Sequence, residues 1–132
     1  MRANTKNFLQ PSLVVSRLDE INLYQLWNQG KRGIILDLDN TIAQWEQDIL
    51  TVQAQNFIEK AKQQGYKICL ISNASRGRTE KIAGHYNIPF VAPAFKPFRR
   101  PFLQAMQYLD LNSDQVIVVG DQIFTDVLGG NR

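Results

Sequence analysis

Cysteine and histidine are nearly absent from the sequence, which has one residue of each among 132. A single cysteine, Cys69, cannot form a disulfide within the chain, and Cys69 with His85 supplies too few ligands for a zinc site. With one histidine, we also find no Ser-His-Asp catalytic set. The lack of cysteine excludes a disulfide-stabilised scaffold and favours a reducing compartment, which we take to be the cytoplasm.

Long hydrophobic runs and a strong excess of one charge are also lacking. No segment approaches the roughly 18 apolar residues of a membrane span, and the first six residues lack the apolar stretch of a secretory signal. The net charge is +3 and the pI is about 9.2, which permits an anionic ligand, although we expect no nucleic-acid partner. The length and the 44% hydrophobic content predict one domain, with an N-terminal arm and helix at residues 1–30 and a core over residues 31–132.

Short apolar segments alternate with helical patterns along the core. The predicted strands lie in residues 33–41, 66–71, 88–91 and 116–119. The predicted helices run from Asp19 to the stop at Gly30, from the cap Thr51 to Gly65, and over residues 76–86 and 101–109. This alternation predicts an α/β fold with a doubly wound, mostly parallel sheet between two layers of helices.

The first 18 residues are weakly patterned. Apolar residues such as Phe8 and Leu13 lie among basic ones, and Pro11 interrupts them. We interpret the segment as an arm that packs on the domain. A weak peripheral contact with a membrane surface is the alternative.

Three of the four predicted strands end in polar residues, and the other, the third, is followed by a Lys-Pro pair. In chain order they are Asp37 and Asp39, then Ser72 and Asn73, then Lys96 before Pro97, and finally Asp121 with Asp126. Open α/β sheets bind their ligands outside the carboxyl ends of the strands. We therefore expect these side chains to meet in one site.

The residue types in this cluster favour phosphoryl transfer. Three carboxylates, those of Asp37, Asp39 and Asp121, cannot remain ionised together without a cation, and an oxygen-only ligand set favours Mg²⁺ over Zn²⁺. Lys96 adds a positive charge and Ser72 a hydroxyl donor, which suit a bound phosphate. We expect Asp37 to be a carboxylate nucleophile, and Asp39 to be the general acid and then the general base.

The four segments together resemble the motifs of the haloacid dehalogenase (HAD) superfamily, in the same order. They are Asp-Leu-Asp-Asn-Thr at 37–41, Ser-Asn at 72–73, Lys-Pro at 96–97, and Gly-Asp at 120–121 with Asp126. Over residues 8–132 the chain is most similar to the YqeG-type branch of subfamily IIIA. The resemblance implies a phosphatase that forms an aspartyl-phosphate on its nucleophile.

The resemblance also implies a role for each residue of the site. Asp37 and Asp39 would be catalytic, and the phosphate would be bound by Thr41, Ser72, Asn73 and Lys96. The Mg²⁺ ligands would be Asp37, Asp121 and the backbone carbonyl of Asp39. Asp126 would support the metal shell. The chain has no insertion long enough for the large cap domain of other HAD enzymes. The family continues into a further strand after Arg132, so we expect the sheet to lack its last strand.

The substrate implied by these features is a phosphate ester, either a small molecule or a lipid phosphate. An uncapped pocket would admit a bulky substrate, and eukaryotic relatives of the YqeG type are phosphatidylglycerophosphate phosphatases. Basic residues follow the second and third motifs, and we expect some of them to hold a second anionic group of the substrate.

Two other functions compete with this hypothesis. A signalling receiver domain also uses clustered carboxylates, but its phosphorylated aspartate should end a strand between the acidic pair and the Ser/Thr, and only Asp48 lies between Asp39 and Ser72. A binding module for phosphate or RNA on a weak or inactive phosphatase scaffold is the second alternative. The complete catalytic set argues against it and the basic loops argue for it.

Overall fold

The computed structural model describes residues 13–15, 18, 21–38, 43–44, 49–73, 75–93 and 99–119. Its main feature is a five-stranded, fully parallel sheet with the strand order β1-β7-β2-β5-β6. The strands are β1 (Leu13–Val15), β2 (Gly33–Asp37), β5 (Lys67–Ile71), β6 (Phe90–Val91) and β7 (Val116–Val119). A small antiparallel hairpin of β3 (Ala43–Gln44) and β4 (Ile49–Leu50) follows β2.

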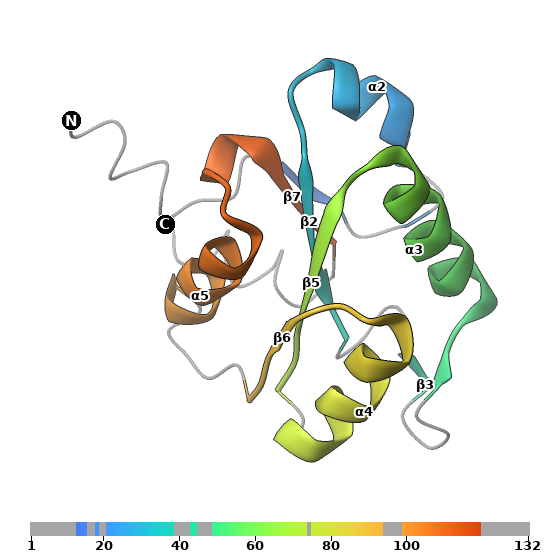
Figure 1. The fold of residues 1–132 in the computed structure, drawn as a ribbon, viewed down its shortest axis with the longest axis vertical. Coiled ribbons are helices and arrows are strands. Elements are labelled where there is room, and N and C mark those ends of the chain that lie inside the picture. Colours follow the sequence, from blue (N-terminus) through green and yellow to red (C-terminus); the bar gives the residue numbers. More distant parts are fainter. Residues whose placement is uncertain are drawn as a thin grey trace.

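Helices cover both faces of this sheet, as Figure 1 shows. Helices α2 (Leu23–Asn28), α3 (Val52–Gln64) and α4 (Arg76–Tyr86) lie on one side, and α5 (Arg99–Leu109) lies on the other. A short 3₁₀ helix, η2 (Ser113–Gln115), leads into β7. The structure thus confirms the predicted three-layer α/β architecture. Since only residues 38–51 separate β2 from α3, the chain has no large cap domain there.

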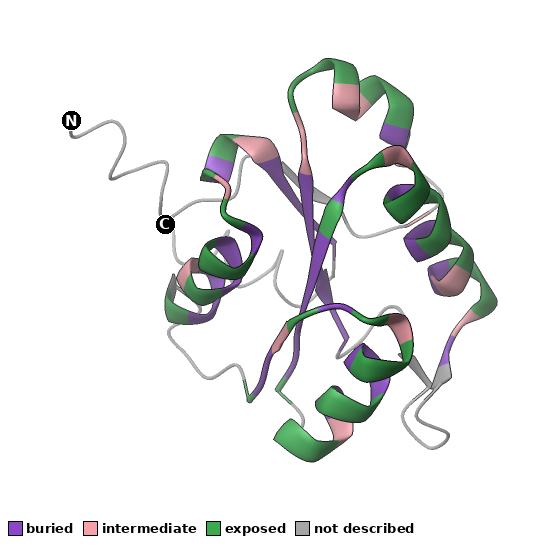
Figure 2. Ribbon diagram, viewed as in Figure 1, coloured by how far each residue is buried: buried purple, intermediate pink, exposed green. Residues whose placement is uncertain are grey.

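The strands are buried on both faces because alternate side chains enter two separate cores. All five residues of β2 are buried, and the purple strands of Figure 2 lie between helices whose outer faces are exposed. In β2, Ile34 and Leu36 belong to the core under α3 and α4, whereas Ile35 belongs to the core under α5. A continuous apolar run is what a central parallel strand requires.

Most helix ends lie at the residues that the sequence predicts. The side chain of Thr51 caps α3 by accepting a hydrogen bond from the backbone N–H of Ala54 at 3.1 Å. The same helix ends at Gly65, whose φ of +106° is a left-handed conformation that glycine adopts without strain. Helix α4 spans residues 76–86, as the pattern indicates.

Several boundaries differ from the predictions, among them the first strand of the core, which ends at Asp37 and not at Thr41. The first helix begins at Leu23 and not near Asp19, because the Asn22 side chain caps it by accepting from the N–H of Gln25. The third strand is confined to Phe90–Val91, since Pro89 has no N–H to donate to a neighbouring strand. The last helix starts two residues earlier than predicted, at Arg99.

The N-terminal arm contributes a strand that the sequence did not indicate. Strand β1 pairs in parallel with β7, with Leu13 opposite Ile117 and Val15 opposite Val119. This part of the arm therefore joins the sheet, while residues 1–12, with Phe8 and Pro11, lie outside the described residues. In the described part of the chain, no helix combines the length and apolar character needed to cross a membrane.

An aromatic cluster fixes α2 at the amino end of the sheet. The Trp27 and Tyr66 rings meet edge to face with centroids 5.2 Å apart, and the Tyr66 hydroxyl donates a hydrogen bond to the Leu23 carbonyl at 2.5 Å. The guanidinium carbon of Arg32 lies 3.9 Å from the Trp27 ring centroid, and its Nη1 donates to the Trp27 carbonyl at 2.8 Å. These contacts tie α2 to the residues that begin β2 and β5.

Candidate active site

The carboxyl edge of the sheet brings the ends of neighbouring strands into one row. Asp37 of β2 pairs with Ile71 of β5, and Ile71 pairs in turn with Val91 of β6. On the other side of β2, Leu36 pairs with Val119, the last residue of β7. These strands therefore end within one residue of the same level, as the predicted cluster of polar residues requires.

Asp37 is the carboxylate at the centre of this edge. It ends β2 with 1% of its surface exposed, in a strand whose other members are apolar. Its Oδ2 atom is buried and accepts no hydrogen bond from the described residues, although other interactions hold the side chain. By the alternation along β2, the side chain projects to the side of the sheet that α5 covers, as Ile35 does.

Ser72 lies directly beyond the end of β5, next to the Asp37 row. Its backbone N–H donates to the Val91 carbonyl at 3.1 Å, and the Leu38 N–H donates to the Ile71 carbonyl at 3.1 Å. These bonds continue the ladder one residue past each strand. Ser72 is 1% exposed and Asn73 is exposed, so the motif offers one buried and one accessible polar group.

Helix α4 starts at the same edge, shortly after Ser72. Its cap Ser75 accepts a hydrogen bond from the Arg78 N–H at 3.2 Å, and the buried Thr79 hydroxyl donates to the Ser75 carbonyl at 3.0 Å. The first helical residue, Arg76, is exposed and places its guanidinium carbon 5.0 Å from the Phe90 ring centroid on β6. This contact cannot be predicted from the sequence, because no local pattern indicates which ring an arginine covers.

Five residues of the predicted site lie outside the described residues. They are Asp39, Thr41, Lys96, Asp121 and Asp126. The structure therefore brings together Asp37, Ser72 and Asn73 and leaves the placement of the other five a prediction, together with the expectation of a missing last strand. Within the described ranges, no group of three or more His, Cys, Asp or Glu residues could hold a metal ion.

Cys69 and His85 have no part in the chemistry of this edge. Burial raises the pKa of the Cys69 thiol to about 12, so the group is a neutral core residue under α5 and not a nucleophile. His85 is exposed near the end of α4, where its ring meets that of Tyr86 edge to face at 4.8 Å.

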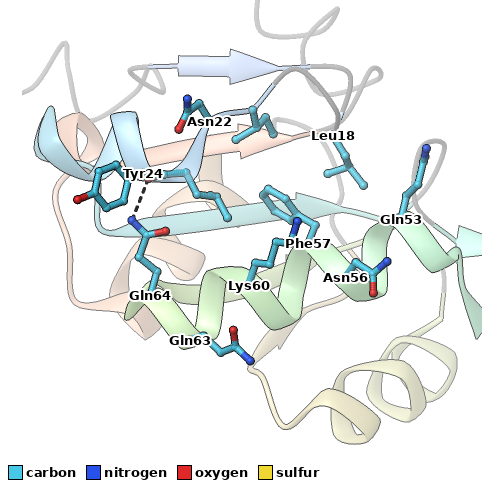
Figure 3. A pocket seen from close by; sticks show the side chains of 11 residues that line it. Leu18, Asn22, Tyr24, Gln53, Asn56, Phe57, Lys60, Gln63 and Gln64 are labelled. Atoms are coloured by element: carbon cyan, nitrogen blue, oxygen red, sulfur yellow. Dashed lines mark hydrogen bonds between the residues drawn. The ribbon is translucent and has the colours of Figure 1, made fainter.

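A groove of about 920 Å³ lies along α3, between that helix and Leu18 with residues 21–24 (Figure 3). Its described lining combines apolar residues with neutral amides and one cation. These residues are Leu18, Ile21, Asn22, Leu23, Tyr24, Gln53, Asn56, Phe57, Lys60, Gln63 and Gln64. Gln64 already donates to the Leu23 carbonyl at 3.3 Å. Neither Asp37 nor Ser72 belongs to this described lining, so the groove is separate from the predicted site.

Comparison with known proteins identifies the family of the chain. The family model of the haloacid dehalogenase-like hydrolases matches residues 17–132. The chain is 35% identical over 127 residues to the probable phosphatase YqeG of Bacillus subtilis strain 168, and the match covers 96% of this chain and 74% of that relative. No solved structure matches the chain significantly.

Proposed function

The chain belongs to the haloacid dehalogenase-like hydrolases and is a phosphatase of that family, and we propose that it hydrolyses phosphomonoesters with Mg²⁺ through an aspartyl-phosphate intermediate. One observation carries the mechanism. Asp37 is a buried carboxylate at the carboxyl edge of the central strand, and the residue after its partner Ile71 is Ser72. A ligand at the end of β2 would meet both groups.

In the first step, a carboxylate oxygen of Asp37 attacks phosphorus and forms a new O–P bond. The bond between phosphorus and the leaving oxygen breaks, and Asp39 gives that oxygen its proton. In the second step, Asp39 takes a proton from water as the water oxygen attacks phosphorus, and the bond between phosphorus and the Asp37 oxygen breaks. Inorganic phosphate leaves, and the Asp37 carboxylate is restored.

The remaining residues of the proposed site hold the phosphate and the cation. Ser72 and Asn73 would donate hydrogen bonds to phosphate oxygens, with Thr41 and Lys96 completing the set. The donors proposed for Mg²⁺ are the carboxylates of Asp37 and Asp121 and the Asp39 carbonyl. Asp37 fits such a site in donor type, since it offers carboxylate oxygen, and Asp126 would support the shell. Mg²⁺ would neutralise the charge that builds up on the phosphoryl group.

The substrate class follows from the short link between β2 and α3. Because that link contains no cap domain, we propose that the site admits bulky phosphates, including lipid phosphates such as phosphatidylglycerophosphate presented at a membrane surface. A cytoplasmic location would give the enzyme access to such a substrate on the inner face of the membrane.

A phosphoenzyme assay tests the proposal. The purified full chain should hydrolyse p-nitrophenyl phosphate with added Mg²⁺, lose that activity in EDTA, and regain it when Mg²⁺ is restored. Rapid acid quenching during turnover, followed by peptide mass spectrometry, should find one phosphoryl group on Asp37. Phosphate on another residue, or salt-sensitive RNA binding with no hydrolysis of any ester, would overturn the mechanism.

A further inference from the structure

Arg76 lies on the carboxyl edge but outside the catalytic set proposed above. We propose that it binds a second anionic group of the substrate, so that the preferred substrates are phosphomonoesters that carry another phosphate, phosphodiester or carboxylate. This inference rests on the proposed phosphatase function and names a substrate class for the same site.

The position of Arg76 follows from the strand register. Phe90, whose ring lies 5.0 Å from the Arg76 guanidinium carbon, pairs with Leu70 and immediately precedes Val91 in the row that contains Asp37. Strand β6 is separated from β2 by β5 alone, so two strand spacings, about 10 Å, lie between them. The guanidinium at Phe90 is therefore displaced from Asp37 across the sheet by about two strand spacings, a separation that an extended substrate with two anionic groups can span.

Asp37 and Phe90, the residue that Arg76 contacts, also belong to opposite faces of the sheet. Ile71, the partner of Asp37, lies in the core under α5, whereas Phe90 packs against the core under α3 and α4. A ligand that reaches both sides must cross the end of β5, where the exposed Asn73 follows Ser72. This path suits an elongated substrate with anionic groups at two positions.

The local structure holds Arg76 ready for an anion. Ser75 caps α4 through the Arg78 N–H, and this bond fixes the backbone where Arg76 begins the helix. The Phe90 ring supports the guanidinium, and a ring on one side of a guanidinium leaves the N–H groups in its plane able to donate. The first turn of α4 contains no acidic residue, and the nearest carboxylate on the helix is that of Glu80, one turn further along. A planar guanidinium can then bind a phosphate or carboxylate through two parallel hydrogen bonds.

A pair of substrates of equal chain length isolates this contact. The probes are the monophosphate and the bisphosphate of 1,4-butanediol and of its longer homologues, assayed with Mg²⁺ at constant ionic strength. For the wild-type chain, kcat/KM should be at least about 10-fold higher for the best bisphosphate than for its monophosphate. A carboxylate-terminated monophosphate of the same length distinguishes a second phosphate from another anion.

Variants assign the preference to Arg76. Arg76→Ala should bring the ratio of the two kcat/KM values close to one, mainly through a higher KM for the bisphosphate, and Arg76→Lys should restore part of it. Lys81→Ala, which removes a cation from the same helix, should leave the ratio as in the wild type. Thermal unfolding of each variant, followed by circular dichroism, checks that the fold is intact.

Three results would overturn the inference. The first is a wild-type chain that hydrolyses both probes without preference. The second is an Arg76→Ala variant that retains the preference, and the third is a preference that Arg100→Ala on α5 removes while Arg76→Ala does not. If the wild type hydrolyses no ester at all, the proposed phosphatase function fails as well, and this outcome is distinct from the other three.

Discussion

Asp37 and Ile71 are register partners at the ends of neighbouring parallel strands. This pairing places Asp37 and Ser72 one residue apart in level on neighbouring strands. Strand spacing and rise put the Cα atoms of Asp37 and Ser72 about 6 Å apart. The predictions below begin from these two residues and then turn to the packing that supports them.

Asp37→Asn should lower kcat/KM for p-nitrophenyl phosphate on the order of 10³-fold or more, because an amide cannot attack phosphorus. The fold should persist, and the melting temperature should stay the same or rise, since a neutral amide is less costly to bury than a carboxylate. Steady-state kinetics and thermal unfolding measure both effects.

Asp110→Asn is the matched control for this change. Asp110 is exposed beyond the C-terminus of α5, with φ at +59°, a conformation that asparagine also adopts readily. The activity of this variant should equal that of the wild type. Retained phosphatase activity in Asp37→Asn would reject Asp37 as the nucleophile.

Ser72→Ala should reduce kcat/KM on the order of 10²-fold through the loss of one donor to the phosphoryl group. Ser113→Ala provides the comparison, because Ser113 is also buried but lies in η2, which precedes β7 at the opposite edge of the sheet. Both variants lose one buried hydroxyl, so their melting temperatures should fall to a similar extent. Equal losses of activity in the two variants would assign Ser72 to the fold alone.

Gly65→Ala and Gly84→Ala should change stability in opposite directions. A Cβ at Gly65 would force φ = +106° on an alanine and would lie 3.1 Å from Trp27 Cη2, so we expect a loss of about 1–3 kcal/mol. Gly84 lies in α4, and a methyl group there would have no other atom within 4 Å among the described residues, so alanine should add up to about 1 kcal/mol. Urea unfolding gives both values. A neutral Gly65→Ala would contradict the close approach of Trp27.

The Cys69 thiol should resist labelling by 5,5′-dithiobis(2-nitrobenzoic acid) at pH 8 in the folded protein and should react fully in urea. Burial raises its pKa from the ordinary 9.0 to about 12. At pH 8 the unfolded chain therefore carries a larger fraction of the reactive thiolate than the folded protein does. Labelling rates with and without denaturant measure this difference. Rapid reaction without urea would show that the α5 core opens readily.

The same shift predicts the alkaline limit of stability. A group whose folded pKa is raised contributes stability that is complete below its unfolded pKa and is lost as the pH rises through the folded value. The free energy of unfolding should therefore fall between about pH 9 and pH 12 for Cys69, and burial also raises the pKa of Tyr66. Cys69→Ala should show a shallower decline. An unchanged slope would assign the pH dependence to other groups.

The fold could be predicted where the chain carries a local signal. The apolar run of β2, the cap Thr51 and the stop Gly65 each specify their own element, and the structure has them as the pattern indicates. Strand β1 could not be predicted, because three residues carry little periodicity and their pairing depends on β7, far along the chain. Helix α2 starts at Leu23, later than predicted, because the Asn22 side chain caps it there and the apolar pattern before it is weak.

The candidate site could be predicted from one rule, that parallel strands end at a common edge. This rule brings Asp37 and Ser72 together, and the register shows them one residue apart in level. The contact of Arg76 with Phe90 could not be predicted, because it depends on how α4 packs beside β6. Sequence patterns locate strand ends well, but they do not indicate which side chains of separate elements touch.

The parallel insertion of β7 between β1 and β2 constrains the order of assembly during synthesis. Strands β2, β5 and β6 with α3 and α4 form a contiguous unit that can fold once residues 33–91 have left the ribosome. Strand β1 must wait for its partner, since β7 emerges only after residue 119. We therefore expect a nascent chain with a sheet of three paired strands and an unpaired β1, which becomes catalytically competent only after β7 has joined the sheet.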